Sequence, residues 1–219
     1  MLPQELLPEK LPTDPLPIFA RWFQEARERK LQPNPDAMVL ATVGPEGQPS
    51  ARVVLCKHVL LDPGCLVFFT NYLSRKGREL RAHPRAAVVF HWDALHRQVR
   101  IEGPISPSPD AESDAYFATR ALDSQIGAWA SEQSALLASR EVLAHRVREA
   151  QTRFGVGTAA ANVPRPPHWG GFRLWIEAIE IWVEGANRVH DRAVWKRELQ
   201  PIAEHELTAG PWVATRLYP

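Results

Sequence analysis

The hydrophobic pattern of the first third of the chain alternates between one helical segment and several strand-like segments. Apolar side chains recur every three or four positions after Asp14 and Pro15, a common helix start, so we expect a helix at residues 15–30. Runs rich in β-branched and aromatic residues, separated by turn-forming Gly and Pro, follow at residues 37–43, 50–58 and 65–71. These runs predict an antiparallel meander.

The remainder of the chain returns to strands after a helical middle. Ser74 is a good cap for a short helix, and strands are expected at 85–95 and 97–105. A helical block then covers about 109–153. Three more strand-like runs follow, at residues 170–185, 188–199 and 211–218. Because strands dominate both ends and helices lie between them, the sequence predicts an α+β fold with a barrel-like antiparallel sheet.

The prolines indicate where regular structure stops. Several of the 20 prolines lie near the start of the chain, so we expect residues 1–14 to form an extended arm. Residues 15–219 are then expected to form a single domain. Segment 155–167, which is rich in Gly, Ala and Pro, is expected to be a loop.

Composition and charge exclude several classes of protein. Hydrophobic residues make up 45% of the 219 positions, which excludes disordered and collagen-like chains. The net charge is only +1, so we expect no nucleic-acid partner and no anionic membrane surface. No apolar run approaches the roughly 20 residues of a membrane span, and a basic-then-apolar signal layout is absent. We therefore expect a cytoplasmic protein, with Cys56 and Cys65 as reduced core residues.

Familiar catalytic motifs are also absent. The eight histidines show no HxH or HExxH spacing and the two cysteines no CxxC, so we expect no metal site. No GxGxxG dinucleotide motif and no GxxxxGK[ST] phosphate loop follows a predicted strand. The GxSxG motif of serine nucleophiles is also missing. The chemistry must then be sought among cationic residues in unusual positions.

Two predicted strands carry such cations. Arg188, His190 and Arg192 alternate with other residues and would share one face of strand 188–199, which is either solvated or meets an anionic or electron-rich ligand. Arg52 and Lys57 lie five positions apart in an apolar strand and nominally face opposite sides. Neither of these two is easily buried without a partner.

Two predicted helices carry further candidates. Ser74 is followed by Arg75 and Lys76, so free N–H groups at a helix start lie beside two cations; this pattern fits a phosphate cradle or plain surface decoration. Later, three polar residues recur at every fourth position and would share one face of an unbroken helix: Tyr116, Arg120 and Ser124.

An ordered series of motifs carries a resemblance to a known family. The runs are RVVLCK (52–57), FFTN (68–71), SRKGREL (74–80), RQVRIEGP (97–104), YFATRALDSQIGAWASEQS (116–134), PPHWGGF (166–172), IEIWVEGANRVHDR (179–192) and RLYP (216–219). In this order they resemble the pyridoxine/pyridoxamine 5′-phosphate oxidase family, from about Leu11 onward. The most specific part is SQIGAW together with Trp182 and the HDR run.

The resemblance implies a fold, a cofactor and a reaction. The fold would be an FMN-binding split β-barrel, antiparallel, with peripheral helices. The protein would be a homodimer with FMN at the subunit interface. The reaction would be oxidation of pyridoxine or pyridoxamine 5′-phosphate by O₂ to pyridoxal 5′-phosphate, with release of hydrogen peroxide and, from the amine, ammonia.

The resemblance also assigns residues. Those expected to hold FMN are Arg52, Val53, Val54, Leu55, Cys56, Lys57, Phe69, Thr70, Arg75, Lys76, Gln98, Gln133, Ser134, Trp182 and Arg192. Those expected to clamp the substrate phosphate are Lys57, Tyr116, Arg120 and Ser124. Arg188 and His190 would lie beside the pyridine ring as catalytic residues, with His190 orienting the ring or assisting proton removal. Two phosphorylated ligands would account for both sets of cations in a nearly neutral chain.

This chain departs from the family pattern at three places, and two other functions stay open. The first ten residues lack an Arg-x-x-Tyr element, Ala121 replaces a usual Pro, and Val183 and Glu184 replace a usual Gln-Gly. One alternative is a related flavin oxidase that acts on another substrate such as a phenazine precursor, which should lack the full phosphate clamp. The other is a non-catalytic FMN-binding or storage module.

Overall fold

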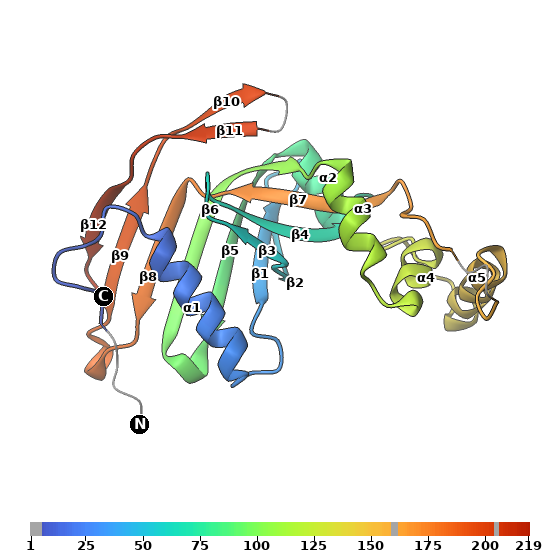
Figure 1. Cartoon of the computed structure of the whole chain (residues 1–219), viewed down its shortest axis with the longest axis horizontal. Helices are drawn as coiled ribbons and strands as arrows, with labels where there is room; N and C mark the ends of the chain where they lie inside the picture. The colour runs from blue at the N-terminus through green and yellow to red at the C-terminus, as the bar shows by residue number, and fades with distance from the viewer. Residues whose placement is uncertain (1–5, 159–161, 204–205) are drawn as a thin grey trace.

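A curled antiparallel sheet is the frame of the computed structural model, which describes residues 6–158, 162–203 and 206–219 (Figure 1). Its strands run in the order β12-β9-β8-β6-β5-β1-β2. Their bounds are β1 (Ala37–Val43), β2 (Pro49–Leu55), β5 (Arg85–Trp92), β6 (Arg97–Pro107), β8 (Ala178–Val183), β9 (Asp191–Lys196) and β12 (Val213–Leu217).

The long strand β6 makes the sheet curl. Its first half pairs with β5 and β8, whereas its last residues pair with β7 (Trp169–Trp175). Strand β7 in turn pairs with β4 (Cys65–Asn71), and β4 pairs with β3 (His58–Leu60). One strand is thereby shared between two walls, and the space between the walls is filled by the core.

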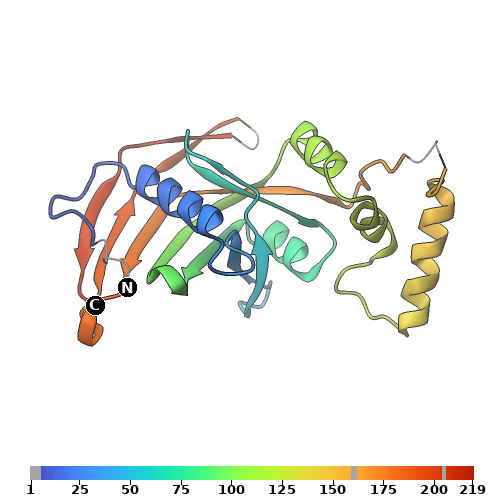
Figure 2. The same cartoon turned by 60° about the horizontal axis from the view of Figure 1, so that its bottom comes forward.

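The helices are α1 (Leu16–Arg29), α2 (Arg75–Ala82), α3 (Asp110–Ala118), α4 (Leu122–Ala130) and α5 (Arg140–Arg153), with 3₁₀ turns at Asp93–Leu95 and Ala186–Arg188. Helix α1 lies across the strands of the sheet, whereas α3, α4 and α5 lie toward one end of the molecule (Figure 1). Figure 2 shows α4 and α5 at the end of the molecule opposite β9 and β12. None of the helices in the described ranges is long and apolar enough to span a membrane.

Helix α1 closes the main core, as its sequence pattern predicts. The Asp14 carboxylate accepts a hydrogen bond from the Leu16 N–H at 2.9 Å, which fixes the helix start. Phe19 and Trp22 are buried, and the Phe19 ring lies 5.5 Å from that of Phe90 on β5. A smaller cluster beneath α3, α4 and α5 contains Phe117, Ile126, Ala150, Val163 and Trp169.

Residues 6–14 contain no helix or strand and run along the C-terminal strands. The Leu7 N–H donates to the Asp191 carboxylate at 2.7 Å, and the Trp195 indole N–H donates to the Pro12 carbonyl at 2.8 Å. The Leu7 side chain is buried. These contacts hold this part of the chain on β9.

The predicted strand 50–58 is wrong beyond residue 55, because the chain changes partner there. Leu55 still pairs with Ala37 on β1, whereas the Lys57 N–H donates to the Val67 carbonyl of β4. Because regular strand pairing is interrupted at Cys56, the alternation of faces along one strand no longer decides which side Lys57 occupies.

The predicted strand 188–199 is likewise wrong at its start. Val183 pairs with Asp191, so the residues between them must form the connection between β8 and β9. Asn187 and Arg188 adopt left-handed backbone conformations with φ of 53° and 65°. Arg188 and His190 therefore lie in a turn, and only Arg192 belongs to the strand.

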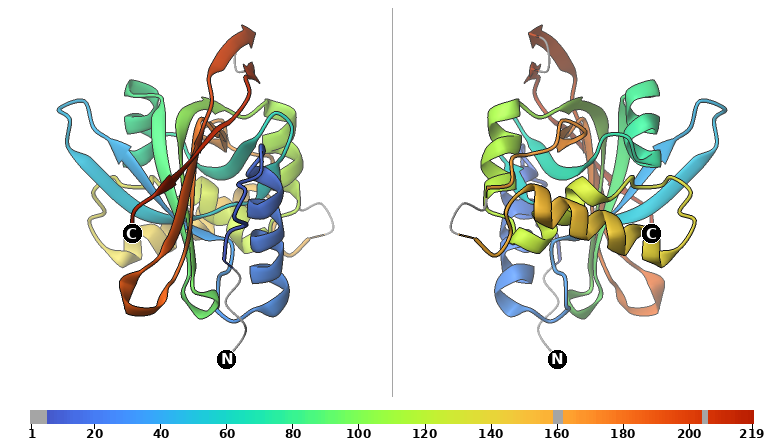
Figure 3. Two further views of the ribbon diagram at one scale, coloured as in Figure 1. Left: turned by 90° about the vertical axis from the view of Figure 1, so that its left-hand side faces the viewer. Right: turned by 90° about the vertical axis from the view of Figure 1, so that its right-hand side faces the viewer.

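Other predicted segments are subdivided. The run 170–185 forms β7 and β8, and the block 109–153 forms three helices. At the first helix break, i→i+3 hydrogen bonds from Thr119 and Arg120 end α3 before α4 begins. The hairpin of β10 (Leu199–Ala203) and β11 (Glu206–Ala209) was not predicted, and Figure 3 shows it projecting from the sheet.

Candidate active site

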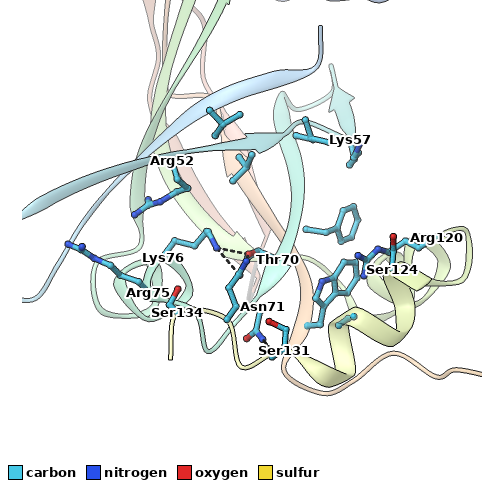
Figure 4. A pocket seen from close by; sticks show the side chains of 18 of the residues that line it. Arg52, Lys57, Thr70, Asn71, Arg75, Lys76, Arg120, Ser124, Ser131 and Ser134 are labelled. Atoms are coloured by element: carbon cyan, nitrogen blue, oxygen red, sulfur yellow. Dashed lines mark hydrogen bonds between the residues drawn. The ribbon is translucent and has the colours of Figure 1, made fainter. Parts of the chain in front are cut away.

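A cavity of about 880 Å³ opens between β2, β4, α2 and α4 (Figure 4). Most residues that the sequence assigned to a site line it: Arg52, Val53, Val54, Leu55, Lys57, Phe69, Thr70, Arg75, Lys76, Tyr116, Arg120, Ser124, Gln133 and Ser134. Figure 4 shows two groups of cations, with Arg52, Arg75 and Lys76 at one end and Lys57 and Arg120 at the other.

Helix α2 builds the first cationic end. Ser74 caps it as predicted, because its hydroxyl accepts from the Gly77 N–H at 3.3 Å. The Lys76 ammonium is buried and donates to Thr70 at 3.0 Å and to Gln133 at 2.9 Å. Burial, and then repulsion by Arg52, lowers the pKa of Lys76 to about 8. A bound anion would stabilise the charged form of this amine.

One buried carboxylate lies behind the two arginines of the same end. Glu79 accepts from Arg75 Nε at 2.8 Å and from Arg52 Nη2 at 3.2 Å. The hydroxyls of Thr42 and Ser50 donate to it as well. Burial alone would raise the pKa of Glu79, but hydrogen bonds from Thr42, Arg75 and Ser50 lower it to about 2. The group is therefore ionised at neutral pH.

Three stacked rings line the other end. The Phe69 and Tyr116 rings are 4.0 Å apart and inclined by 13°, and the Trp169 ring lies 5.6 Å from Phe69 at 9°. Arg120 lies over this wall, with its guanidinium carbon 4.7 Å from the Trp169 ring centroid. Its Nη1 is buried without a hydrogen-bond partner among the described residues. Burial lowers the pKa of Arg120, because it disfavours the charged form. Among the described residues, no carboxylate pairs with this guanidinium to offset that effect.

The break between α3 and α4 does not separate the predicted clamp. Tyr116 lies on α3, Arg120 in the connection and Ser124 in the first turn of α4, yet all three line the cavity. Lys57 also lines it and forms an ion pair with Asp36 at 3.2 Å.

The remaining predicted residues lie elsewhere. Cys56 does not line the cavity; it is buried, and burial raises the pKa of its thiol to about 12. Gln98, Trp182 and Arg192 form one row across β6, β8 and β9, because Gln98 pairs with Trp182 and Trp182 with Arg192. The His190 ring lies 4.6 Å from that of Trp182, beside this row.

The row and the cavity use opposite faces of the sheet. The residues next to the row, Val99, Ile181 and Ala193, are fully buried, so the row itself points away from the core. Arg52 instead pairs with the core residue Leu40 and shares its inner face. Strands β1, β5 and β6 also separate β2 from β8. Within one chain these two sets do not meet.

The residues in and behind the cavity lining that were not singled out from the sequence include Glu79, which lies behind the lining, and Trp169 and Asn71, which are part of it. Glu79 and Trp169 lie inside the family-like runs SRKGREL and PPHWGGF, but nothing in either run marks them. Asn71 lines the cavity and donates to the Ser131 carbonyl at 3.3 Å, which holds the segment after α4. In the described part of the chain, no cluster of His, Cys, Asp and Glu could hold a metal ion.

Two family models match the chain. Residues 24–154 match pyridoxamine 5′-phosphate oxidase, and residues 169–219 match the C-terminal dimerisation region of pyridoxine 5′-phosphate oxidase. The pyridoxine/pyridoxamine 5′-phosphate oxidase of Cupriavidus necator is 51% identical over 206 residues, covering 94% of this chain and 89% of that protein. The protein of the same name from Burkholderia lata is 50% identical with the same coverage.

Solved structures share the fold. PhzG from Burkholderia lata 383, in complex with tetrahydrophenazine-1-carboxylic acid, matches with a TM-score of 0.83 and 29% identity, covering 98% of both chains. A pyridoxamine 5′-phosphate oxidase-related, FMN-binding protein from Nostoc punctiforme matches with a TM-score of 0.67 and 15% identity, covering 93% of this chain and 96% of that one. These likenesses confirm the predicted α+β split-barrel fold.

Proposed function

The chain belongs to the pyridoxamine 5′-phosphate oxidase family, and we propose that it oxidises pyridoxine or pyridoxamine 5′-phosphate to pyridoxal 5′-phosphate, with FMN as cofactor and O₂ as electron acceptor. The observation that carries the proposal is the unpaired Nη1 of Arg120 at one end of a cavity whose other end holds three further cations. Two phosphorylated ligands need two separate groups of cationic hydrogen-bond donors, one for each phosphate. The proposal keeps the cytoplasmic location expected from the sequence.

The first end fits the phosphate of FMN. A phosphate carries up to two negative charges and takes several charge-assisted hydrogen bonds, and Arg52, Arg75 and Lys76 can donate them. The lowered pKa of Lys76 supports this assignment, because a phosphate would restore the charge that burial disfavours. Thr70 and Gln133 offer neutral partners for the ribityl chain.

The second end fits the substrate phosphate. Arg120 has a free donor there, and Lys57, Tyr116 and Ser124 lie around the same end as further partners. When bound, FMN supplies the hydride acceptor for the substrate carbon that bears the alcohol or amine, and O₂ takes up the electrons as hydrogen peroxide. The task of this end is to hold the substrate at a fixed distance from the flavin.

Arg188 and His190 are assigned to the pyridine ring. The Gly185 N–H donates to His190 Nδ1 at 3.1 Å, so a neutral His190 carries its proton on Nε2. That nitrogen is then a donor toward the substrate. This arrangement supports an orienting role for His190 over proton removal.

A second copy of the chain completes the site in this proposal. Gln98, Trp182 and Arg192 point away from the core of their own chain and are assigned to the flavin of the partner. Val53 is 64% exposed and Val39 41% exposed on the same outer face, which supports apolar contact between copies. The match to a dimerisation region over residues 169–219 supports the same homodimer.

The likeness to PhzG favours one alternative, oxidation of a phenazine precursor. Such a tricyclic acid carries no phosphate, so it would leave the clamp around Arg120 without its proposed ligand. The two functions therefore differ in how strongly they depend on this residue.

Anaerobic mixing of the flavin-loaded protein with each substrate tests the proposal. We expect the flavin absorbance to bleach with pyridoxine phosphate and with pyridoxamine phosphate. Persistent yellow colour with both would overturn the proposed function, and bleaching by tetrahydrophenazine-1-carboxylic acid alone would support the alternative.

A further inference from the structure

Glu79 lies behind the first cationic end without lining the cavity. It is only 5% exposed and reaches from α2 to the paired residues Thr42 of β1 and Ser50 of β2. Its Oε1 accepts from Arg75, and its Oε2 accepts from Arg52, Thr42 and Ser50. The protein thus supplies four donors to this carboxylate, about as many as a carboxylate has acceptor positions, with one on Oε1 and three on Oε2.

The two arginines that it holds come from different elements. Arg52 lies on β2 and Arg75 at the start of α2, and the Arg75 side chain is 56% exposed. A long exposed arginine loses rotamer freedom when a ligand fixes it, which weakens binding unless the side chain is held beforehand. Arg52 and Arg75 also carry like charges close to Lys76. Glu79 reduces both effects: its hydrogen bonds restrict the rotamers of the two arginines, and its negative charge offsets the repulsion between the cations.

We propose that Glu79 is a positioning residue that presents Arg52 and Arg75 to the phosphate of FMN. This inference rests on the proposed function, which places that phosphate at this end. Thr42 is part of the same hydrogen-bond network, because its hydroxyl donates to Glu79 and accepts from Arg52. Thr42 itself does not line the cavity.

A different role makes the opposite prediction. If Glu79 only dilutes positive charge, its neutralisation should strengthen phosphate binding, because the cations would act undiminished. If Glu79 positions the arginines, Glu79→Gln should weaken it. Glutamine has one acceptor oxygen, so its amide cannot accept from Arg52 and Arg75 on separate atoms, and one arginine is released.

The experiment compares FMN with riboflavin, which has the same ring and ribityl chain but no phosphate. Dissociation constants of both flavins are measured from fluorescence quenching on the full-length chain stripped of flavin. In Glu79→Gln we expect the preference for FMN to fall about 10-fold or more, at an unchanged riboflavin constant. Thr42→Val should lower the same preference by a smaller factor.

The matched control is Glu112→Gln. Glu112 is half-buried and pairs with Arg173 at 3.1 Å, away from the cavity lining, so its loss should leave the FMN preference unchanged. An unchanged or increased FMN preference in Glu79→Gln overturns the inference. If Glu79→Gln binds neither flavin, Thr42→Val decides, and an unchanged preference there overturns it. Failure of the proposed function would look different: the flavin of the parent protein would stay oxidised with pyridoxine phosphate and with pyridoxamine phosphate. That result would not change the ratio of the FMN and riboflavin dissociation constants.

Discussion

Arg120 lies over the face of Trp169, with 4.7 Å between the guanidinium carbon and the ring centroid. The Phe117 ring lies 5.6 Å from the same carbon, and Arg120 has no ion-pair partner among the described residues. An aromatic face attracts a guanidinium without occupying its N–H groups. In contrast, Lys57 is paired with Asp36, and Arg52 and Arg75 share Glu79. Arg120 is thus held in place with its donors still available.

Arg120→Ala should weaken capture of the substrate and leave the flavin in place. A hydrogen bond to a charged group is worth about 1.5–3 kcal/mol, so kcat/KM for pyridoxine phosphate should fall roughly 10- to 150-fold. If Arg120 binds substrate and transition state equally, the loss appears mainly in KM. Steady-state kinetics and flavin content measure both parts.

Unphosphorylated pyridoxine is the control for Arg120. It offers no phosphate for the guanidinium, so parent and mutant should process it poorly but equally. A loss by the same factor on both substrates would show that Arg120 is structural and that the assignment of the 116–124 segment is wrong.

FMN affinity should decrease as pH rises through about 8. The pKa of Lys76 is lowered to about 8 in the flavin-free chain, mainly by burial and then by Arg52, while Glu79 opposes the shift. Phosphate binds the protonated amine, and FMN therefore binds the form that is lost above this pH. Flavin fluorescence titrations between about pH 7 and pH 9.5 measure the effect.

Two controls isolate Lys76 in this titration. Riboflavin lacks the phosphate and should show no comparable loss of affinity over the same range. Lys76→Met should bind FMN more weakly at neutral pH and with a flatter pH profile. A mutant profile as steep as that of the parent would assign the titration to another group.

Arg192→Ala should weaken FMN retention if the guanidinium meets the flavin of a partner chain. In one chain Arg192 donates to Glu180 at 2.9 Å and lies on the outer face of the sheet. A merely solvated face would tolerate the change within about 0.5 kcal/mol. Arg100→Ala is the matched comparison, since Arg100 also pairs with Glu180, at 3.2 Å, and has no assigned flavin contact. Equal FMN affinity in both mutants and the parent would favour the solvated face.

FMN binding and dimerisation should be thermodynamically linked. A ligand that binds only the dimer stabilises the dimer by mass action, so FMN should shift the monomer–dimer equilibrium toward the dimer. Sedimentation at micromolar protein concentration, with and without FMN, tests this. A monomer saturated with flavin would contradict the proposed interface.

Short-range chemistry in the sequence determined much of this protein. The apolar spacing behind Asp14 predicted helix α1, and Ser74 caps α2 as expected, because a hydroxyl at that position satisfies a free N–H group. The ordered motifs pointed to the family that the comparisons then showed, and with it to most residues that line the cavity. The two helix starts depend on neighbours within a few positions, and each motif is a short run whose place in the order along the chain is read directly from the sequence.

Only the tertiary structure decided how distant residues meet. Arg52 and Lys57 line one cavity because the chain changes strand partner at Cys56, which alternation along a single strand cannot express. The register of Val183 with Asp191 decided that Arg188 and His190 lie in a turn. Glu79 looks like an ordinary surface residue of a polar helix, and it acquires its role only because β1 and β2 bring Thr42 and Arg52 against it. The register with which distant strands pair determines these contacts, and that register cannot be read from the spacing of residues along the sequence.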